Sequence, residues 1–157
     1  MSFDRDPRVS LVDARTITLA GEEYLIPRLM LRQTIVIGPL MPAALRFINR
    51  RADAFKAVEK SAGKKNKPVD VAALNEHDRE NLIDAVTLSE EETGIALRIV
   101  CAGLGRLYPS VTLDALYDLP INPGELVMAL PAIFAQAGTA KKAEDAAPVG
   151  EEQAASR

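Results

Sequence analysis

The chain has 157 residues, of which 48% are hydrophobic and 26% charged, and this globular composition predicts one folded domain. Aromatic residues make up only 4%, with no tryptophan, which disfavours a surface that stacks nucleic-acid bases. A single cysteine, Cys101, excludes an internal disulfide and a cysteine-rich metal site. A single histidine, His77, removes most acid–base schemes, so the composition argues against an enzyme and predicts a cytoplasmic protein.

The charges are unevenly distributed along the chain, although the net charge is only −3. Residues 46–67 hold eight basic and two acidic side chains, a balance of +6, whereas residues 68–157 hold six basic and fifteen acidic ones, a balance of −9. This asymmetry favours association within the chain or with a partner. No stretch has the roughly 20 apolar residues needed to span a bilayer, and the mixed charges at the N-terminus are unlike a signal peptide.

Residues 16–28 predict a β-hairpin. Ile17 and Leu19 alternate with threonines, the pattern of a strand with one buried face. Gly21 permits a positive φ in the turn, and Pro27 ends the second strand because it lacks a ladder donor. Since an isolated hairpin is marginal in water, its apolar residues are expected to pack on the body or to form an edge that joins copies of the chain: Ile17, Leu19, Tyr24 and Ile26.

The next segment predicts two helices separated by prolines. The dense apolar residues from Leu29 to Ile37 begin the first helix, which Gly38, Pro39 and Pro42 are expected to interrupt. A second helix is predicted from Pro42 toward Lys60, with one apolar face formed by Leu45, Ile48, Ala52, Phe55 and Val58. Residues 61–70, which follow this helix, have the composition of a linker.

The chain after this linker predicts two further helices. Asn75 can cap a helix whose apolar stripe contains Leu82, Ile83 and Val86. Ser89 and Glu92 have the spacing of a capping box, in which the serine accepts a hydrogen bond from the amide three residues on. The helix after this box directs apolar residues toward the core: Ile95, Ile99, Val100, Gly103, Leu104 and Leu107.

A short turn of helix from Thr112 to Tyr117 and one longer helix complete the predicted domain. Asn122 and Pro123 begin the longer helix, Pro131 is expected to kink it, and Gly138 is placed to end it. The predicted fold is therefore mainly α with a small N-terminal β-hairpin, an α+β architecture. It comprises an N-terminal arm at residues 1–14, a single compact helical domain at 15–138, and a disordered tail at 139–157, where apolar periodicity is missing.

Three candidate chemical sites have simpler structural interpretations. Glu90–Glu92 are expected to favour a helix N-terminus, since no second carboxylate cluster accompanies them as metal ligands. Cys101 is expected to be a buried, inert thiol, because His77 lies among charged residues and no third catalytic group completes the pair. Gly103 and Gly105 fall near a helix end, which favours close packing over phosphate binding. No catalytic, cofactor-binding or metal-binding residue is predicted.

Five short motifs, in their order along the chain, carry a resemblance to a known family. The motifs are Ile-Thr-Leu-Ala-Gly-Glu-Glu-Tyr-Leu-Ile-Pro, Leu-Met-Leu-Arg-Gln, Arg-Leu-Tyr-Pro-Ser-Val-Thr-Leu-Asp-Ala-Leu, Leu-Pro-Ile-Asn-Pro-Gly-Glu-Leu and Ala-Ile-Phe-Ala-Gln-Ala-Gly. With them, the chain over residues 15–138 resembles the small tail assembly chaperones of long-tailed bacteriophages and prophages. The basic insertion at 60–70 and the prolines at 39 and 42 depart from that pattern.

The resemblance implies a protein that is not an enzyme, has no cofactor and acts in the cytoplasm of a bacterial host. Such chaperones bind the tape measure protein while the tail tube forms around it, and they are absent from the finished virion. Many relatives also have a longer product made by ribosomal frameshifting. The major tail tube protein is a further candidate partner, self-association is expected, and neither nucleic acid nor a membrane is expected as a partner.

Apolar helix faces can bind an amphipathic client helix, and methionine adds adaptability to such a groove. The same faces can instead form the core, which is the commoner outcome. Two other functions stay open: a structural or adaptor protein retained in the tail, and a nucleic-acid-binding regulator acting through residues 46–67. The candidate client-binding residues are Leu29, Leu31, Ile35, Met41, Leu126, Leu130, Ile133 and Phe134.

Overall fold

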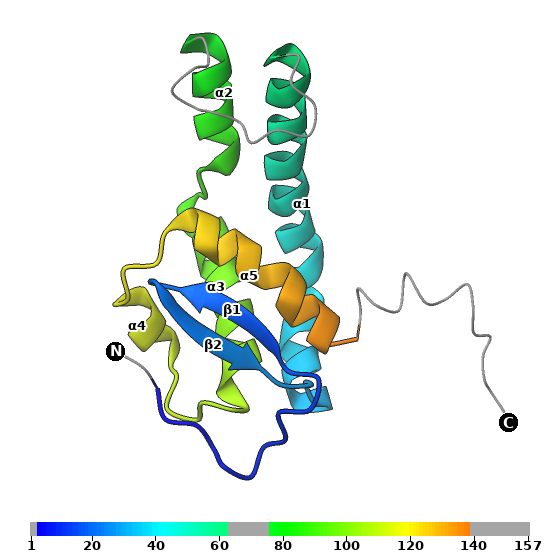
Figure 1. Ribbon diagram of the computed structural model, residues 1–157, viewed down its shortest axis with the longest axis vertical. Helices are drawn as coiled ribbons and strands as arrows, with labels where there is room; N and C mark the ends of the chain where they lie inside the picture. The colour runs from blue at the N-terminus through cyan, green and yellow to red at the C-terminus, as the bar shows by residue number, and fades with distance from the viewer. Residues whose placement is uncertain (1–2, 63–75, 139–157) are drawn as a thin grey trace, which may run out of the picture.

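The computed structural model describes residues 3–62 and 76–138, which form a β-hairpin followed by helices (Figure 1). The hairpin packs on α5 and α3, and α3 packs in turn on α1. The predicted architecture, mainly helical with an N-terminal hairpin, is confirmed. The predicted tail at 139–157 and most of the predicted linker lie outside the described residues. The elements are β1 (Arg15–Leu19), β2 (Glu22–Ile26), α1 (Leu31–Ala62), α2 (Glu76–Val86), α3 (Glu90–Gly105), α4 (Leu113–Tyr117) and α5 (Pro123–Gln136).

The hairpin is closed by a two-residue turn and held against α5. β1 and β2 are antiparallel, with Leu19 opposite Glu22 at the turn. Ala20 and Gly21 between them both have positive φ, 52° and 78°, as in a type I′ turn. Their amides donate hydrogen bonds of 2.8 and 3.3 Å to the two carboxylate oxygens of Glu125 in the first turn of α5. This carboxylate therefore ties the tip of the hairpin to the last helix.

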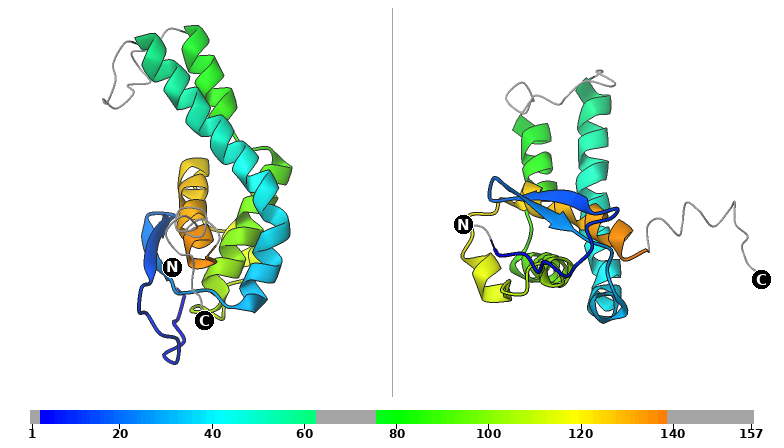
Figure 2. Two further views of the ribbon diagram at one scale, coloured as in Figure 1. Left: turned by 90° about the vertical axis from the view of Figure 1, so that its right-hand side faces the viewer. Right: turned by 60° about the horizontal axis from the view of Figure 1, so that its bottom comes forward.

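The segment from Leu31 to Ala62 forms one continuous helix, so the prediction of two helices separated at Pro39 and Pro42 is wrong. A proline removes only its own N–H donor and bends the helix, and packing on α3 holds the helix together across both positions. Figure 2 shows that α1 changes direction along its length. The continuous helix also determines which of its faces is buried. Ile37, Ala44, Phe47 and Val58 are buried, whereas Leu45 and Ala52, which the sequence places on one apolar face with Val58, are exposed.

The second half of α1 and the antiparallel α2 project together from the rest of the molecule (Figures 1 and 2). We call residues 46–62 with α2 the helical arm, and the remaining described residues the body. Val58 and Leu82 are buried in the helical arm, whereas Ile83, which the sequence places in the apolar stripe of α2, is 50% exposed. The helical arm is thus a two-helix layer with little core of its own.

The helices of the body begin where the sequence predicts. Ser89 accepts a hydrogen bond from the Glu92 amide while the Glu92 carboxylate accepts one from the Ser89 amide, which confirms the capping box. The side chains of Thr112 and Asn122 cap α4 and α5 by accepting hydrogen bonds from the amides of Ala115 and Glu125, respectively. Pro123 occupies the first turn of α5, and the helix continues through Pro131. Local capping chemistry therefore sets these starts.

The core of the body lies between the hairpin, α3 and α5. Gly103 on α3 lets Ile133 of α5 approach so closely that a Cβ at position 103 would lie 3.0 Å from the Cγ2 atom of Ile133. This confirms that the glycine serves helix packing. The Tyr24 and Tyr108 rings meet edge to face at 5.5 Å, and the Tyr108 hydroxyl accepts a hydrogen bond of 2.9 Å from the Leu25 amide.

The described residues before the hairpin contact this core without forming a helix or strand. The Phe3 ring lies 6.1 Å from the Tyr24 ring, and Val9 packs against the core cluster. The Asp6 amide donates a hydrogen bond of 2.7 Å to the Leu107 carbonyl. Residues 3–9 are thus anchored to the body by both apolar and main-chain contacts.

Candidate docking face on α1

The first half of α1 carries a row of apolar residues on its exposed side. Leu31 is 75% exposed, Ile35 is 63% exposed and Leu45 is 41% exposed. Gly38 and Pro42, both exposed, lie between them, so the row has steps of four and three residues. That spacing keeps all five positions on one side of a helix and is the seam spacing of paired helices. We call this row the α1 face: Leu31, Ile35, Gly38, Pro42 and Leu45.

The α1 face is exposed because α1 is covered by the body on one side only. Ile37, Ala44 and Phe47 point to the opposite side, where they join the core, and α3 packs there. Val36 is also 47% exposed, but it follows Ile35 by one residue, a rotation of about 100° around the helix, so it lies outside the α1 face. Several large apolar side chains that lie together on one surface mark an interaction site more often than single ones do.

The two prolines interrupt the main-chain hydrogen bonding of the α1 face. Pro39 and Pro42 have no N–H, so the carbonyls of Ile35 and Gly38, four residues earlier, lack their usual helical donor. Both carbonyls belong to residues of the exposed side.

The charged groups beside the α1 face are basic. Arg32 and Arg46 are exposed and follow Leu31 and Leu45 by one residue, which places both on the same flank of the helix. The sequence from Leu31 to Ala52 contains no aspartate or glutamate. A partner helix with acidic residues beside its apolar stripe therefore matches this face in charge.

The start of α1 is fixed to the body by polar contacts. The Leu29 amide donates to the Gln136 carbonyl at 3.1 Å, and the Gln136 side chain donates to the Ile26 carbonyl at 2.7 Å and to the Asp13 carbonyl at 2.8 Å. Arg106 donates to the Arg28 carbonyl. These contacts connect β2, the end of α3 and the end of α5 to the residues that precede α1. They therefore hold the N-terminal end of α1, where the α1 face begins, in place on the body.

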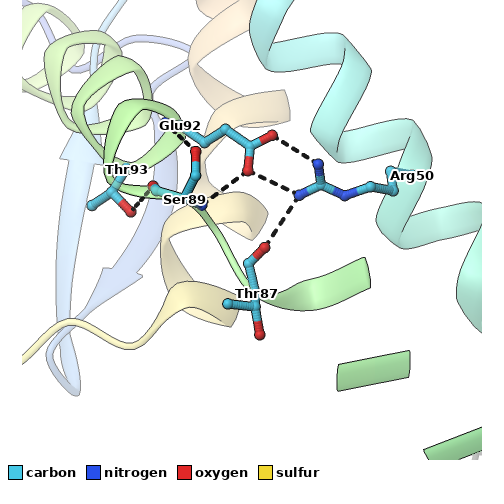
Figure 3. Close-up of polar contacts among 5 residues, drawn as sticks. All are labelled: Arg50, Thr87, Ser89, Glu92 and Thr93. Carbon is cyan, nitrogen blue, oxygen red and sulfur yellow. Dashed lines mark hydrogen bonds and ion pairs between the residues drawn. The ribbon is translucent and has the colours of Figure 1, made fainter. Parts of the chain in front are cut away.

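A second anchor lies where the body meets the helical arm (Figure 3). Arg50 forms two hydrogen bonds, of 2.8 and 3.0 Å, with the carboxylate of Glu92, and a third of 3.2 Å with the Thr87 carbonyl. The same carboxylate accepts the Ser89 amide of the capping box. Hydrogen bonding to Arg50 lowers the pKa of Glu92, against the opposing effect of partial burial. Arg50 thus links α1 to the start of α3.

The structure divides the eight predicted client-binding residues into two groups. Leu31 and Ile35 lie on the α1 face, and Leu29 and Met41 beside it are partly buried against the core. The other four residues are buried between the hairpin and α3, where they present no open surface. The sequence analysis also allows these apolar faces to form the core, and the burial of the four residues favours that interpretation over client binding. The four residues are Leu126, Leu130, Ile133 and Phe134.

The four hairpin residues predicted for an oligomer edge are also buried. Their side chains point from the hairpin into the core, so an edge between copies would use the strand main chain instead of these side chains. The alternation of the strand confirms the sequence pattern, because the threonines between them are exposed. The buried residues are Ile17, Leu19, Tyr24 and Ile26.

Residues 38, 42 and 45 of the α1 face are not among the client-binding residues that the sequence predicts. The sequence pattern places a helix boundary at Pro42 and puts Leu45 on the apolar face of a second helix, so it divides the row between two predicted helices. The steps of four and three residues from Leu31 to Leu45 are the signal that identifies it once both prolines are allowed inside one helix.

The structure also describes the surroundings of Cys101 and of part of the basic segment. Burial raises the pKa of the Cys101 thiol, which opposes formation of a nucleophilic thiolate. Within residues 3–62 and 76–138, no group of three or more His, Cys, Asp and Glu side chains could hold a metal ion. Two arginines of the basic segment 46–67 are engaged inside the molecule: Arg50 with Glu92, and Arg51 over the Phe55 ring at 5.0 Å.

Comparisons with protein-family models, with curated proteins and with solved structures return no match for this chain. None of the helices in the described part of the chain combines the length and the apolar character needed to cross a membrane.

Proposed function

We propose that the chain is a tail assembly chaperone of a long-tailed phage or prophage, and that the α1 face covers apolar helical segments of the tape measure protein during assembly of the tail tube. The observation that carries this proposal is the exposed row from Leu31 to Leu45 on a helix that is otherwise anchored. The motif resemblance over residues 15–138 supplies the identity of the client.

The chemistry of the α1 face supports a helical client. Its steps of four and three residues match the apolar stripe of an amphipathic helix laid alongside. Arg32 and Arg46 flank it on one side, so a client stripe bordered by glutamate or aspartate binds best. Burying such a stripe keeps an unassembled client from aggregating through its own apolar surface.

Co-expression with the tape measure protein of the same genetic locus tests the proposal. The full chain should raise the soluble fraction of this client, and the two proteins should co-purify. The variant Ile35→Ser should lower the affinity at least about ten-fold, since a central apolar contact of an interface contributes about 2 kcal/mol or more.

Ile83→Ser is the matched control, because Ile83 is the same residue type, is 50% exposed and lies on α2 of the helical arm. This variant should retain the activity of the unmodified chain. Equal client solubility with and without the chain, or equal loss in both variants, contradicts the proposal. Mass spectrometry of purified virions then distinguishes a chaperone from an adaptor protein. A chaperone should be missing from the finished tail, whereas an adaptor should be present in it.

A further inference from the structure

A second surface, separate from the α1 face, lies between β1 and α5. It is a groove of about 330 Å³ with Thr16–Thr18 of β1 on one side and Gly124, Glu125, Met128 and Ala129 of α5 on the other. Arg51 of α1 lines it as well. Met128, which is 66% exposed, adds an apolar contact in its wall. The groove therefore combines a strand, an arginine and an exposed methionine.

The strand edge that faces this groove has open main-chain groups. In the register of the hairpin, Thr16 is opposite Leu25 and Thr18 is opposite Glu23. The Leu25 amide points away from β1, because it donates to the Tyr108 hydroxyl. Thr16 and Thr18 thus belong to the pairs that do not exchange hydrogen bonds within the hairpin, and their N–H and C=O groups point to the free edge of β1. Such an edge accepts an additional strand.

Arg51 has donors that the described residues leave unused. Its Nε atom is buried and has no hydrogen-bond partner within residues 3–62 and 76–138. Its Nη1 atom lies 3.6 Å from the Met128 sulfur, which is a weak acceptor. The guanidinium is held over the Phe55 ring, and a Cβ placed on Gly124 would lie 3.7 Å from its Nη2 atom. A buried donor without an acceptor is costly, so this position favours an incoming acceptor.

We propose that this groove binds an extended acidic segment of another protein, which adds to β1 as a third strand and places one carboxylate against Arg51. The main-chain groups of Thr16 and Thr18 would supply the strand pairing, and Nε with a terminal nitrogen of Arg51 would hold the carboxylate through two parallel hydrogen bonds. The first turn of α5 adds a favourable positive potential beside the carboxylate.

The charges around the groove favour this occupant over a second copy of the chain. Glu125 also lines the groove and carries a negative charge, but both of its oxygens accept the turn amides of Ala20 and Gly21, so it does not bond to Arg51, whose guanidinium is left to receive a carboxylate from outside. A second copy that paired through its own β1 would bring Arg15 and no carboxylate, since the strand sequence is Arg-Thr-Ile-Thr-Leu. An acidic strand is therefore the complementary partner.

Two pentapeptides test the proposal on the unmodified full-length chain: acetyl-Thr-Val-Glu-Val-Thr-amide and the same peptide with glutamine in place of glutamate. Each is titrated while nitrogen–proton NMR spectra follow the Thr16 and Thr18 amides and the Arg51 Nε–H group. The glutamate peptide should shift all three signals, with a dissociation constant about ten-fold lower than that of the glutamine peptide.

Arg51→Gln should remove this difference between the peptides, whereas Arg98→Gln, which removes an exposed arginine of α3 that does not line the groove, should keep it. Equal affinity of both peptides for the unmodified chain overturns the carboxylate assignment without any variant. Shifts that sodium acetate reproduces in full overturn the strand pairing. Shifts that follow protein concentration alone show that a second copy occupies the edge, and they overturn the proposal as well.

Discussion

Two apolar helix faces of this protein have opposite environments, although both are predicted to bind the client. The face of α5 that contains Leu130 and Ile133 is fully buried, whereas Leu31 and Ile35 on α1 are exposed. The hairpin covers α5 on one side and α3 covers it on another, while α1 packs on α3 and leaves its far side open. The number of neighbouring elements, and not the apolar pattern of the helix, decides which face can bind a partner.

Among the substitutions that test this difference, those that remove a buried side chain from α5 should lower the free energy of unfolding most. Ile133→Ala leaves a cavity between α5 and α3 and should lower the free energy of unfolding by about 2–5 kcal/mol. Urea denaturation followed by circular dichroism measures the change. A loss below about 1 kcal/mol would mean that the α5 face is loosely covered and could open to a client.

A methyl group added at the close contact between α3 and α5 should lower the stability almost as much. Gly103→Ala places a Cβ at 3.0 Å from the Ile133 Cγ2 atom, so the Ile133 side chain must move by a few tenths of an ångström. The variant should therefore be less stable than a glycine-to-alanine variant at an open position of the same helix, by about 1–3 kcal/mol. The control is Gly105→Ala on the same helix, where a Cβ meets no atom within 4 Å. Thermal unfolding of the two variants measures the difference, and equal melting temperatures would contradict the tight packing.

The contact that holds α1 on the body should show a smaller, pH-dependent effect. Arg50→Ala removes the bonds to Glu92 and Thr87 and should cost about 1 kcal/mol at neutral pH, a value limited by solvent screening at the half-exposed arginine. Because the folded-state pKa of Glu92 lies below its ordinary value of 4.5, the stabilisation is present above pH 4.5 and is lost as the pH falls through the lowered pKa.

Denaturant unfolding of both proteins between about pH 7 and pH 3 checks this sign. The difference in stability between the unmodified chain and Arg50→Ala should shrink as the pH falls. A difference that grows toward acid would show that the ion pair does not provide the stabilisation. Arg46→Ala, at an exposed arginine one turn earlier, is the control and should change stability little at any pH.

The smallest effect on stability is expected on the α1 face itself. Ile35→Ser changes a side chain that is 63% exposed, so the free energy of unfolding should change by no more than about 0.5 kcal/mol. The same denaturation experiment measures it. A loss as large as that of Ile133→Ala would place Ile35 in the core and end the contrast between the two faces.

Local sequence signals predicted much of the fold. The alternation in β1, the capping box of Ser89 and Glu92, and the cap of Asn122 each depend on neighbouring residues, and each is confirmed. The continuity of α1 could not be predicted in this way, because packing on α3 offsets the local cost of Pro39 and Pro42. A tertiary contact outweighs a local preference there.

The candidate site was predicted only in part for the same reason. The apolar residues of α1 and α5 cannot be ranked by exposure from the pattern of either helix alone. Leu31 and Leu130 are the same residue type and differ only in what covers them. The groove at Arg51 depends on three elements meeting, β1, α1 and α5, which no single segment of sequence indicates.

The most direct test of the account is a titration of the full chain with a designed amphipathic helical peptide whose leucine stripe is bordered by glutamates, followed by methyl NMR. The account predicts that the methyl signals of Leu31, Ile35 and Leu45 shift, while those of Leu130 and Ile133 stay at their positions. Shifts centred on Leu130 and Ile133, with the α1 signals unchanged, would contradict it.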